Sequence, residues 1–404
     1  EFRNGVTHTI KERERMALST TTFPKLLQKA GYETGIFGKW HLGDEDAYQP
    51  YNRGFSEVFI HGAGGIGQSY EGSCADFPPN QKNRYFDCHI LHNDRIVKTK
   101  GFCTDVFFQG ALGWIRQQRE AKTPYFAYIS TNAPHGPMIA PESYKRRFLD
   151  LGYDGNTAGR YGMIENIDHN FGLLMDKLDE WNAWEDTLVI FMTDNGQAGR
   201  GGKRYGERTP MFTAGFKTGK GSPYEGGTHV PAFWRWKGVL GEGVNISQLT
   251  AHIDLFKTFC ALAKVDVPTD IQKIDGRSLL PLLEDPMAAW EDRQLFTHQG
   301  RWKKGEDPNE SQFKNCAVRT QRWRFVNNAE LYDIQNDPYE MTNVIEAHPE
   351  VVAELREVYD QWWKETVPLM VNEDAPYAPE QPQRVRYEKQ LKEGGIPDWQ
   401  APVL

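Results

Sequence analysis

The 404-residue chain lacks long hydrophobic runs. Its longest apolar segments, such as Leu188–Met192, are far shorter than the roughly 18 residues that a membrane-spanning helix needs. It also lacks a long stripe of Lys and Arg. The formal net charge is −8, and residues of both signs are mixed throughout. These absences predict no membrane span and no nucleic-acid partner. A local group of cations can still bind a small anion, since screening confines most surface charge effects to about 10 Å.

Cysteine is scarce and carries no metal-binding pattern. The five cysteines form no Cys-x-x-Cys pair, and at least one of them must stay unpaired within a monomer. They are Cys74, Cys88, Cys103, Cys260 and Cys316. The chain begins with Glu1, without an initiator Met and without the apolar core of a signal peptide. This beginning predicts that an N-terminal part is missing.

Helical and strand-like patterns alternate in the first half of the chain. Helical patterns over residues 25–30, 104–119 and 158–181 precede strand-like apolar runs at 33–40, 124–131 and 187–193. This alternation predicts an α/β fold in which helices cover both faces of a mostly parallel sheet. In contrast, residues 44–100 are rich in Gly, Asn, Asp and Pro without a sustained period, which predicts a long irregular excursion.

The C-terminal third has a different pattern. Short strand candidates at 294–298, 317–320, 322–326 and 330–334 are followed by an amphipathic helix at 349–364. We therefore predict a catalytic domain over 1–285, ending near Asp285-Pro286, and a smaller α+β subdomain over 286–367 with an antiparallel sheet. Residues 368–404 are charged and Pro-rich and are predicted to form an irregular tail.

Polar residues follow the ends of the predicted strands. Ligands of open α/β sheets bind beyond the carboxyl ends of the strands, so Lys39, His41, His135, Asp194 and Asn195 are expected to share one edge. Asp194 and Asn195 offer adjacent oxygen donors, which suit Ca²⁺ or Mg²⁺ better than zinc. Taken alone, Asp-Asn-Gly is more often an ordinary turn.

Four side chains have both a functional and a structural interpretation. Lys39 and His41 flank Trp40, so they would point to one side of an extended chain while Trp40 enters the core. His135 lies in a stiff Pro-His-Gly-Pro loop, which suits a fixed acid but is also a common turn. Lys220 lies in a Gly-rich loop that lets the backbone approach a ligand, although such lysines are usually only solvated.

The order of these motifs resembles the type I sulfatase family of the alkaline phosphatase-like superfamily. The resemblance rests on Gly-Lys-Trp-His-Leu-Gly at 38–43, Pro-His-x-Pro at 134–137, Thr-Asp-Asn-Gly at 193–196 and the Gly-Lys-Gly-Ser-x-Tyr-Glu-Gly-Gly-x-x-Val-Pro segment at 219–231. It continues through 275–281 and 330–338, and so covers the chain to about residue 365.

In that family a cysteine within Cys-x-Pro/Ala-x-Arg becomes formylglycine, whose hydrate attacks the sulfur of the substrate. The resemblance implies that Asp194 and Asn195 bind the divalent cation, Ca²⁺ or Mg²⁺. It also implies that Lys39 and Lys220 neutralise the sulfate. Preorganised cations of this kind stabilise charge that develops on the sulfuryl oxygens.

The resemblance gives the two histidines different roles. His41 would support the formylglycine hydrate and its regeneration, while His135 would hydrogen-bond the sulfate and protonate the leaving oxygen. A poor alkoxide leaving group needs such a proton in the transition state.

The chain departs from the family pattern in three places. No cysteine lies in a Cys-x-Pro/Ala-x-Arg context, and the early Asp-Asp pair of the metal site is missing. Both normally lie upstream of a segment like Arg3-Asn4-Gly5-Val6, so truncation is the simplest account, and the chain alone is expected to be inactive. The third departure is His229, which occupies a position where the family usually has Arg.

We therefore interpret the parent protein as a hydrolase of sulfate esters, acting on a sulfated carbohydrate or an aryl sulfate. One alternative is a phosphodiesterase or phosphonate hydrolase of the same superfamily, and another is a non-catalytic protein that binds sulfated glycans. The resemblance also implies a periplasmic or secreted location.

Overall fold

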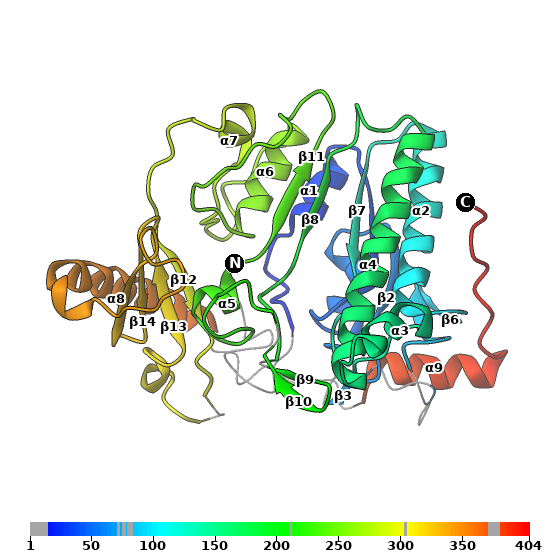
Figure 1. Ribbon diagram of the computed structural model, residues 1–404. Helices are drawn as coiled ribbons and strands as arrows, with labels where there is room; N and C mark the ends of the chain where they lie inside the picture. Colours follow the sequence, from blue (N-terminus) through cyan, green and yellow to red (C-terminus); the bar gives the residue numbers. More distant parts are fainter. Residues whose placement is uncertain are drawn as a thin grey trace.

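The computed structural model describes residues 15–70, 73–74, 78, 84–199, 201–210, 212–302, 305–370 and 380–404. Its centre is a five-stranded mixed sheet with the order β6-β5-β2-β1-β7, in which β1 pairs in parallel with β2 and β7 (Figure 1). The strands are β1 (Glu33–Lys39), β2 (Glu57–His61), β5 (His89–His92), β6 (Arg95–Lys98) and β7 (Tyr125–Ser130).

The central strand β1 is buried on both faces. Ile36 belongs to one core cluster and Phe37 to another, as expected when successive side chains point to opposite faces. On the Phe37 side, the ring lies 5.7 Å from the Trp114 ring of helix α2 (Cys103–Ala121). Because both faces are covered, the sequence of β1 is a nearly continuous run of apolar and small residues.

Helices cover the sheet and the region beside it. Helix α4 (Gly155–Glu180) packs against α2, and α1 (Phe23–Lys29) packs against α6 (Asp254–Leu262) (Figure 1). The remaining helices of this part are α3 (Glu142–Asp150), α5 (Glu225–Thr228) and α7 (Leu280–Glu284), with 3₁₀ turns at Asp46–Tyr48 and Pro50–Arg53. No helix in the described ranges is long and apolar enough to cross a membrane.

Two predictions about strands need correction. Residues 44–100 are not simply irregular, because they contribute β2, β5 and β6 to the central sheet. These strands have only four or five residues, too few to show a period in the sequence. In addition, β8 (Val189–Met192) pairs within the described residues only with β11 (Ala232–Arg235), in a separate antiparallel ribbon. An apolar run identifies a strand but does not identify its partner.

The C-terminal part contains a second sheet with the order β12-β13-β14-β15, antiparallel throughout. Its strands are Leu295–His298, Cys316–Arg319, Trp323–Val326 and Glu330–Asp333, with 3₁₀ turns at Pro308–Ser311 and Ile345–Ala347. One face packs against α8 (Pro349–Met370), where Val318 and Leu331 share a core cluster with Tyr359. The predicted α/β architecture with a C-terminal antiparallel subdomain is therefore confirmed, whereas the boundaries at 285 and 367 remain predictions.

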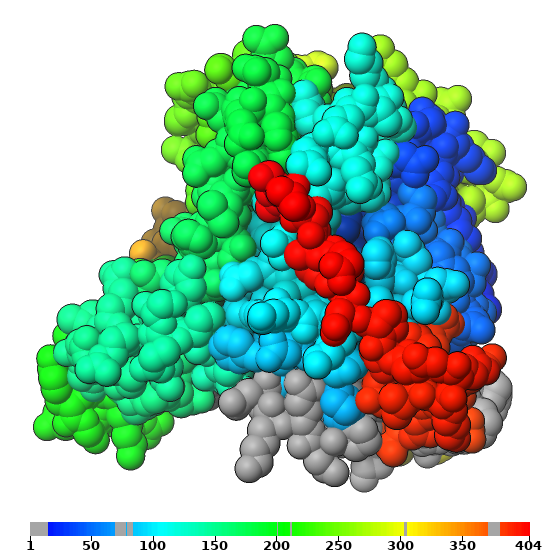
Figure 2. Space-filling view, turned by 90° about the vertical axis from the view of Figure 1, so that its right-hand side faces the viewer, coloured from blue at the N-terminus to red at the C-terminus, as the bar shows by residue number. Residues whose placement is uncertain are grey.

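The C-terminal tail is not irregular throughout, contrary to expectation. It forms α9 (Pro382–Glu393), whose Tyr387 joins the core on the Ile36 side of the sheet. Beyond the helix, the Trp399 ring lies 4.8 Å from that of Phe59, and the last residues run across α2 (Figure 2), where Arg116 donates to the Val403 carbonyl at 2.6 Å. Only two residues of α9 are fully buried, which explains why its sequence shows little apolar periodicity.

Short hairpins complete the fold. They are formed by β3 (Ser69–Tyr70) with β4 (Ser73–Cys74), and by β9 (Gly202–Arg204) with β10 (Glu207–Thr209).

Candidate functional site

The first site segment leaves the sheet at the end of β1. Lys39 is the last residue of this strand, and its carbonyl accepts a hydrogen bond from Ser130 Oγ of β7 at 2.8 Å. The next side chain, Trp40, is buried, and its indole N–H donates to the Gly43 carbonyl at 3.1 Å. Trp40 is therefore anchored in the core, as the sequence predicts, and Lys39 and His41 precede and follow it in the chain.

A Gly-rich segment after β2 lies against both candidate histidines. A Cβ atom on Gly64 would be 2.7 Å from His41 Cε1, and one on Gly65 would be 2.9 Å from His135 Nδ1. Neighbouring glycines thus allow the backbone to approach both rings at a distance that a side chain would prevent. The structure therefore brings His41 and His135 to the same place, although 93 residues separate them in the chain.

The loop that carries His135 is fixed by hydrogen bonds. Its Nδ1 donates to the Gly136 carbonyl at 2.8 Å, which leaves Nε2 as the ring nitrogen that can act on a substrate. Tyr85 also holds this loop in place, because its hydroxyl contacts the carbonyl oxygens of His135 at 2.9 Å and of Gly136 at 2.7 Å.

The surroundings of His135 lower the pKa of its imidazole. Burial is the main cause that lowers this pKa, and the positive charges of Lys39, Lys220 and His41 lower it further. The imidazole is therefore neutral near pH 7 and lies in the positive field of the Lys39 and Lys220 ammonium groups. The structure thus brings together the lysines and histidines that the sequence singled out.

His61 is a member of this group that sequence reasoning missed. It is the last residue of β2 and pairs in register with Lys39. It is fully buried, and its Nδ1 donates to the Gly62 carbonyl at 2.8 Å. Burial, followed by the charges of Lys39, His41 and His135, lowers the pKa of His61 to about 3. Recognition of β2 would have placed it at the same strand edge.

Asp194 and Asn195 follow β8. The Asn195 side-chain amide donates from Nδ2 to the Gly196 carbonyl at 2.8 Å, and its oxygen remains as an acceptor on the residue next to Asp194. This donor set fits a hard cation in kind, but it supplies only two of the six or more oxygens that Ca²⁺ takes. Within the described ranges, no three His, Cys, Asp or Glu side chains gather as metal ligands.

Two segments, here called the aspartate turn (194–197) and the lysine loop (217–228), are joined by backbone hydrogen bonds. Gly196 N donates to the Gly227 carbonyl at 3.0 Å, and Lys220 N donates to the Gln197 carbonyl at 2.9 Å. The position of Lys220 is therefore tied to that of Asp194 and Asn195.

His229 shows how the chain accommodates its departure from the family pattern. Its Nδ1 lies 2.7 Å from Glu225 Oε2, and its ring stacks on Phe216 with a centroid distance of 4.7 Å. The imidazole thus binds the carboxylate from within the same short helix region.

The cysteines do not supply a nucleophile among the side chains that the structure describes. Cys88, Cys103, Cys260 and Cys316 are buried and free. Burial raises the pKa of the Cys88 and Cys260 thiols to about 11 and also raises the other two, which disfavours the reactive thiolate. The side chain of Cys74 and the segment Arg3–Val6 lie outside the described residues.

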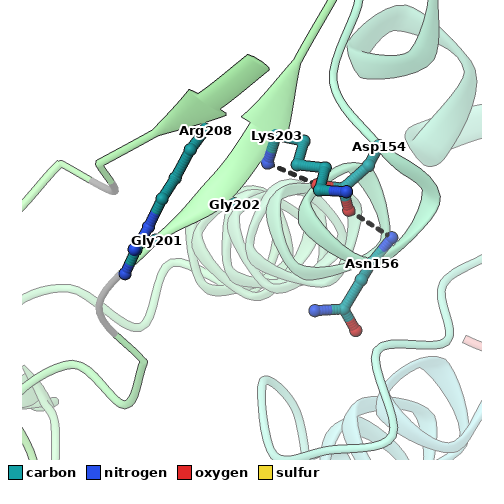
Figure 3. Close-up of a pocket in the computed structure, with 6 residues that line it drawn as sticks. All are labelled: Asp154, Asn156, Gly201, Gly202, Lys203 and Arg208. Carbon is teal, nitrogen blue, oxygen red and sulfur yellow. Dashed lines mark hydrogen bonds between the residues drawn. The ribbon is translucent and has the colours of Figure 1, made fainter. Parts of the chain in front are cut away.

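A surface hollow elsewhere contains none of the predicted site residues. It lies between the β9–β10 hairpin and the start of α4, and it is lined by Asp154, Asn156, Gly201, Gly202, Lys203 and Arg208 (Figure 3). The Asp154 carboxylate is already occupied there, because it caps α4 through Asn156 N and Thr157 N, both at 2.9 Å. This carboxylate stabilises the start of α4 and is not available to bind a ligand.

Comparisons with known proteins agree with the order of the motifs. A family model described as sulfatase matches residues 2–265, and one described as N-sulphoglucosamine sulphohydrolase, C-terminal, matches residues 219–365. The chain is 32% identical over 283 residues to the N-acetylgalactosamine-6-sulfatase of Canis lupus familiaris, which covers 69% of this chain and 51% of that protein. It is 26% identical over 370 residues to the uncharacterized sulfatase YdeN of Escherichia coli (strain K12), which covers 84% of this chain and 61% of that protein.

A solved structure extends the agreement to the fold. Ps i-CgsB in complex with k-i-k-neocarrahexaose has a TM-score of 0.71 and 26% identity, covering 96% of this chain and 83% of that one. The chain spans between about half and three-fifths of the length of the curated relatives named above. With a family match over residues 2–265 and a shared fold over nearly all of its length, the chain belongs to the sulfatase family.

Proposed function

We propose that this protein hydrolyses sulfate esters of a carbohydrate, and that the described site binds the sulfate group. One observation carries the proposal: the Gly64–Gly65 backbone lies against both His41 and His135, and Lys39 and Lys220 are close enough for their charges to lower the pKa of His135. A concentration of positive charge around one neutral imidazole is suited to an anion that also needs a proton donor. One relative is named for an amino sugar, as an N-acetylgalactosamine-6-sulfatase, and the similar solved structure is a complex with the oligosaccharide k-i-k-neocarrahexaose.

The residues of the site divide the work of hydrolysis. The ammonium groups of Lys39 and Lys220 would bind sulfate oxygens and stabilise the charge that grows on them in the transition state. His135 Nε2 would donate a proton to the leaving alkoxide, because its Nδ1 is held by Gly136. A bound sulfate would also offset the positive field that lowers the pKa of His135, so the substrate would help to protonate its own acid.

His41, whose ring lies against Gly64, would assist the nucleophile. Asp194 and Asn195 would hold part of a Ca²⁺ or Mg²⁺ ion, which supplies Lewis-acid stabilisation of the sulfate oxygens when bound. A formylglycine nucleophile and further metal ligands would complete the site, although the 404 residues contain neither a Cys-x-Pro/Ala-x-Arg motif nor an Asp-Asp pair. We expect this chain by itself to turn over little or no substrate.

The test compares two forms of the protein on three substrates. The full-length natural protein and the 404-residue chain are assayed with N-acetylgalactosamine 6-sulfate, an aryl sulfate and an aryl phosphate diester. We expect sulfate release by the full-length protein alone. Exclusive turnover of the phosphate diester would replace the proposal with phosphodiester hydrolysis, and salt-sensitive glycan binding without turnover would replace it with a binding function. Cell fractionation of the full-length protein tests the expected periplasmic or secreted location.

A further inference from the structure

The lysine loop is held between the aspartate turn and the C-terminal sheet. On one side its backbone binds the aspartate turn through the Gly196–Gly227 and Lys220–Gln197 hydrogen bonds. On the other side, Asn315 beside β13 donates to the Gly221 carbonyl at 2.9 Å. The loop therefore transmits any displacement of the C-terminal sheet to Lys220.

A buried ionic cluster joins the loop to the sheet. Glu225 of the loop is 3% exposed, and its Oε1 accepts hydrogen bonds from Arg319 of β13, at 2.9 Å, and from Arg324 of β14. Burial alone would raise the pKa of Glu225, but His229, Arg324 and Arg319 outweigh burial and hold the pKa well below its usual range. Glu225 is therefore ionised, and a second buried carboxyl, that of Glu340, lies 3.3 Å from Arg324 Nε.

Arg324 is the member of this cluster with the most contacts to the loop. It is also 3% exposed, and its guanidinium binds three points of the loop: the Pro223 carbonyl, the Glu225 carboxylate and Thr228 Oγ1, the last at 3.1 Å. These points lie on both sides of the tight Gly226–Gly227 corner. A planar fork with several donors can fix such a corner, whereas a single ammonium group cannot.

The packing around the corner leaves it little freedom. A Cβ atom on Gly226 would be 2.2 Å from the Lys217 carbonyl oxygen, and one on Gly227 would be 2.2 Å from that of Ser222. The loop backbone is thus folded tightly on itself. Fixing Pro223 and Glu225 consequently fixes Lys220.

We propose that Arg324 of the C-terminal sheet is a positioning residue, which acts through Glu225 and Pro223 to hold Lys220 and the aspartate turn in their working places. The inference rests on the proposed function for its catalytic consequence, but the placement of Lys220 is testable without turnover. The C-terminal subdomain would then be part of the sulfate site and not an appendage to it.

The experiment replaces Arg324 with Met in the full-length protein. Val318→Ala is the matched control, because Val318 is equally buried in the neighbouring strand but faces α8. Both variants are expected to lower the melting temperature. Only Arg324→Met is expected to lower kcat/KM, by about 100-fold, the effect of a displacement near 1 Å in a site.

A second measurement follows Lys220 directly. In the 404-residue chain, NMR titration gives the pKa of His135, which the charge of Lys220 helps to lower. Arg324→Met is expected to raise this pKa and to weaken the binding of inorganic sulfate, while Val318→Ala changes neither. An unchanged His135 pKa and sulfate affinity in Arg324→Met would overturn the positioning role, even if the melting temperature falls.

Arg324→Lys is a second variant that keeps the test decisive if Arg324→Met does not fold. It keeps the buried positive charge beside Glu225 but cannot bind all three points of the loop, so an intermediate loss of sulfate affinity is expected. Full wild-type affinity in Arg324→Lys would show that the charge alone suffices and would refute a role for the fork. If the full-length wild-type protein shows no sulfatase turnover, the proposed function fails, while the NMR and sulfate measurements still decide the role of Arg324.

Discussion

Replacing Gly196 with Ala should separate the aspartate turn from the lysine loop. A Cβ atom at this position would lie 1.9 Å from the Gly226 carbonyl oxygen and 3.0 Å from Gly227 Cα. Because both contacts are backbone atoms, no side-chain rotation can relieve them. The two segments must move apart by at least about 1 Å, which also breaks the 3.0 Å hydrogen bond from Gly196 N to the Gly227 carbonyl.

The expected cost is larger for function than for stability. Overpacking of this kind costs about 1–3 kcal/mol of unfolding free energy. A displacement near 1 Å between Asp194 and Lys220 should lower kcat/KM of the full-length protein by about 100-fold. Weaker binding of Ca²⁺ should accompany the loss, because the cation is proposed to bind at Asp194 and Asn195.

Gly172→Ala is the matched control. Gly172 lies within α4, and a Cβ atom there would meet no atom within 4 Å. This substitution should raise stability by up to about 1 kcal/mol, since Ala is the better helix former, and should leave kcat/KM unchanged. If Gly196→Ala retains kcat/KM within about twofold of the wild type, the two segments do not depend on each other as the structure implies.

Three further predictions concern single side chains. Lys220→Ala should lower kcat/KM of the full-length protein by about 10- to 100-fold, which corresponds to the loss of a hydrogen bond to a charged group. Lys237→Ala, at an exposed lysine, is the control and should leave kcat/KM unchanged. Equal losses in the two variants would contradict the assignment of Lys220. His61, with its pKa lowered to about 3, binds a proton at pH 5 only when the chain unfolds, so stability falls as the pH drops below about 6.5. Between pH 7 and pH 5 the unfolding free energy of the wild type should fall by about 2 kcal/mol more than that of His61→Asn, measured by urea unfolding, and parallel pH curves would refute this. Asp254 is fully buried, and its carboxylate accepts hydrogen bonds from Arg293, at 2.7 Å, and from Arg277 N, at 2.8 Å. Asp254→Ala should cost about 3–5 kcal/mol in denaturant unfolding because it leaves the Arg293 charge buried without its partner, and a loss below 1 kcal/mol would argue against that pairing.

The elements with a long or strong pattern were predictable. Helices α2 and α4 agree with their predicted ranges to within three residues at either end, because an amphipathic helix of many turns repeats its signal. The short strands β2, β5 and β6 escaped prediction, since four or five residues between turns carry no period. The helix α9 escaped for a related reason, because a charged helix that buries two side chains has almost no apolar stripe.

Sequence alone determined which residues to consider at the site. Lys39, His41, His135 and Lys220 stand in motifs whose order is similar to that of one family, and strand ends predict a shared edge. Sequence patterns are local, however, and they do not state which distant segments touch. His61 was missed for this reason, although it lies beside Lys39 in the sheet.

Tertiary structure alone decided what holds the site together. The hydrogen bonds between the aspartate turn and the lysine loop, and the binding of Glu225 by Arg319 and Arg324, join residues 23 to 99 positions apart. No periodicity or motif spacing encodes such contacts, because they depend on how the two sheets meet. The sequence thus singled out the candidate groups of a sulfatase site, and only the tertiary structure showed that the C-terminal sheet packs on the loop that carries Lys220.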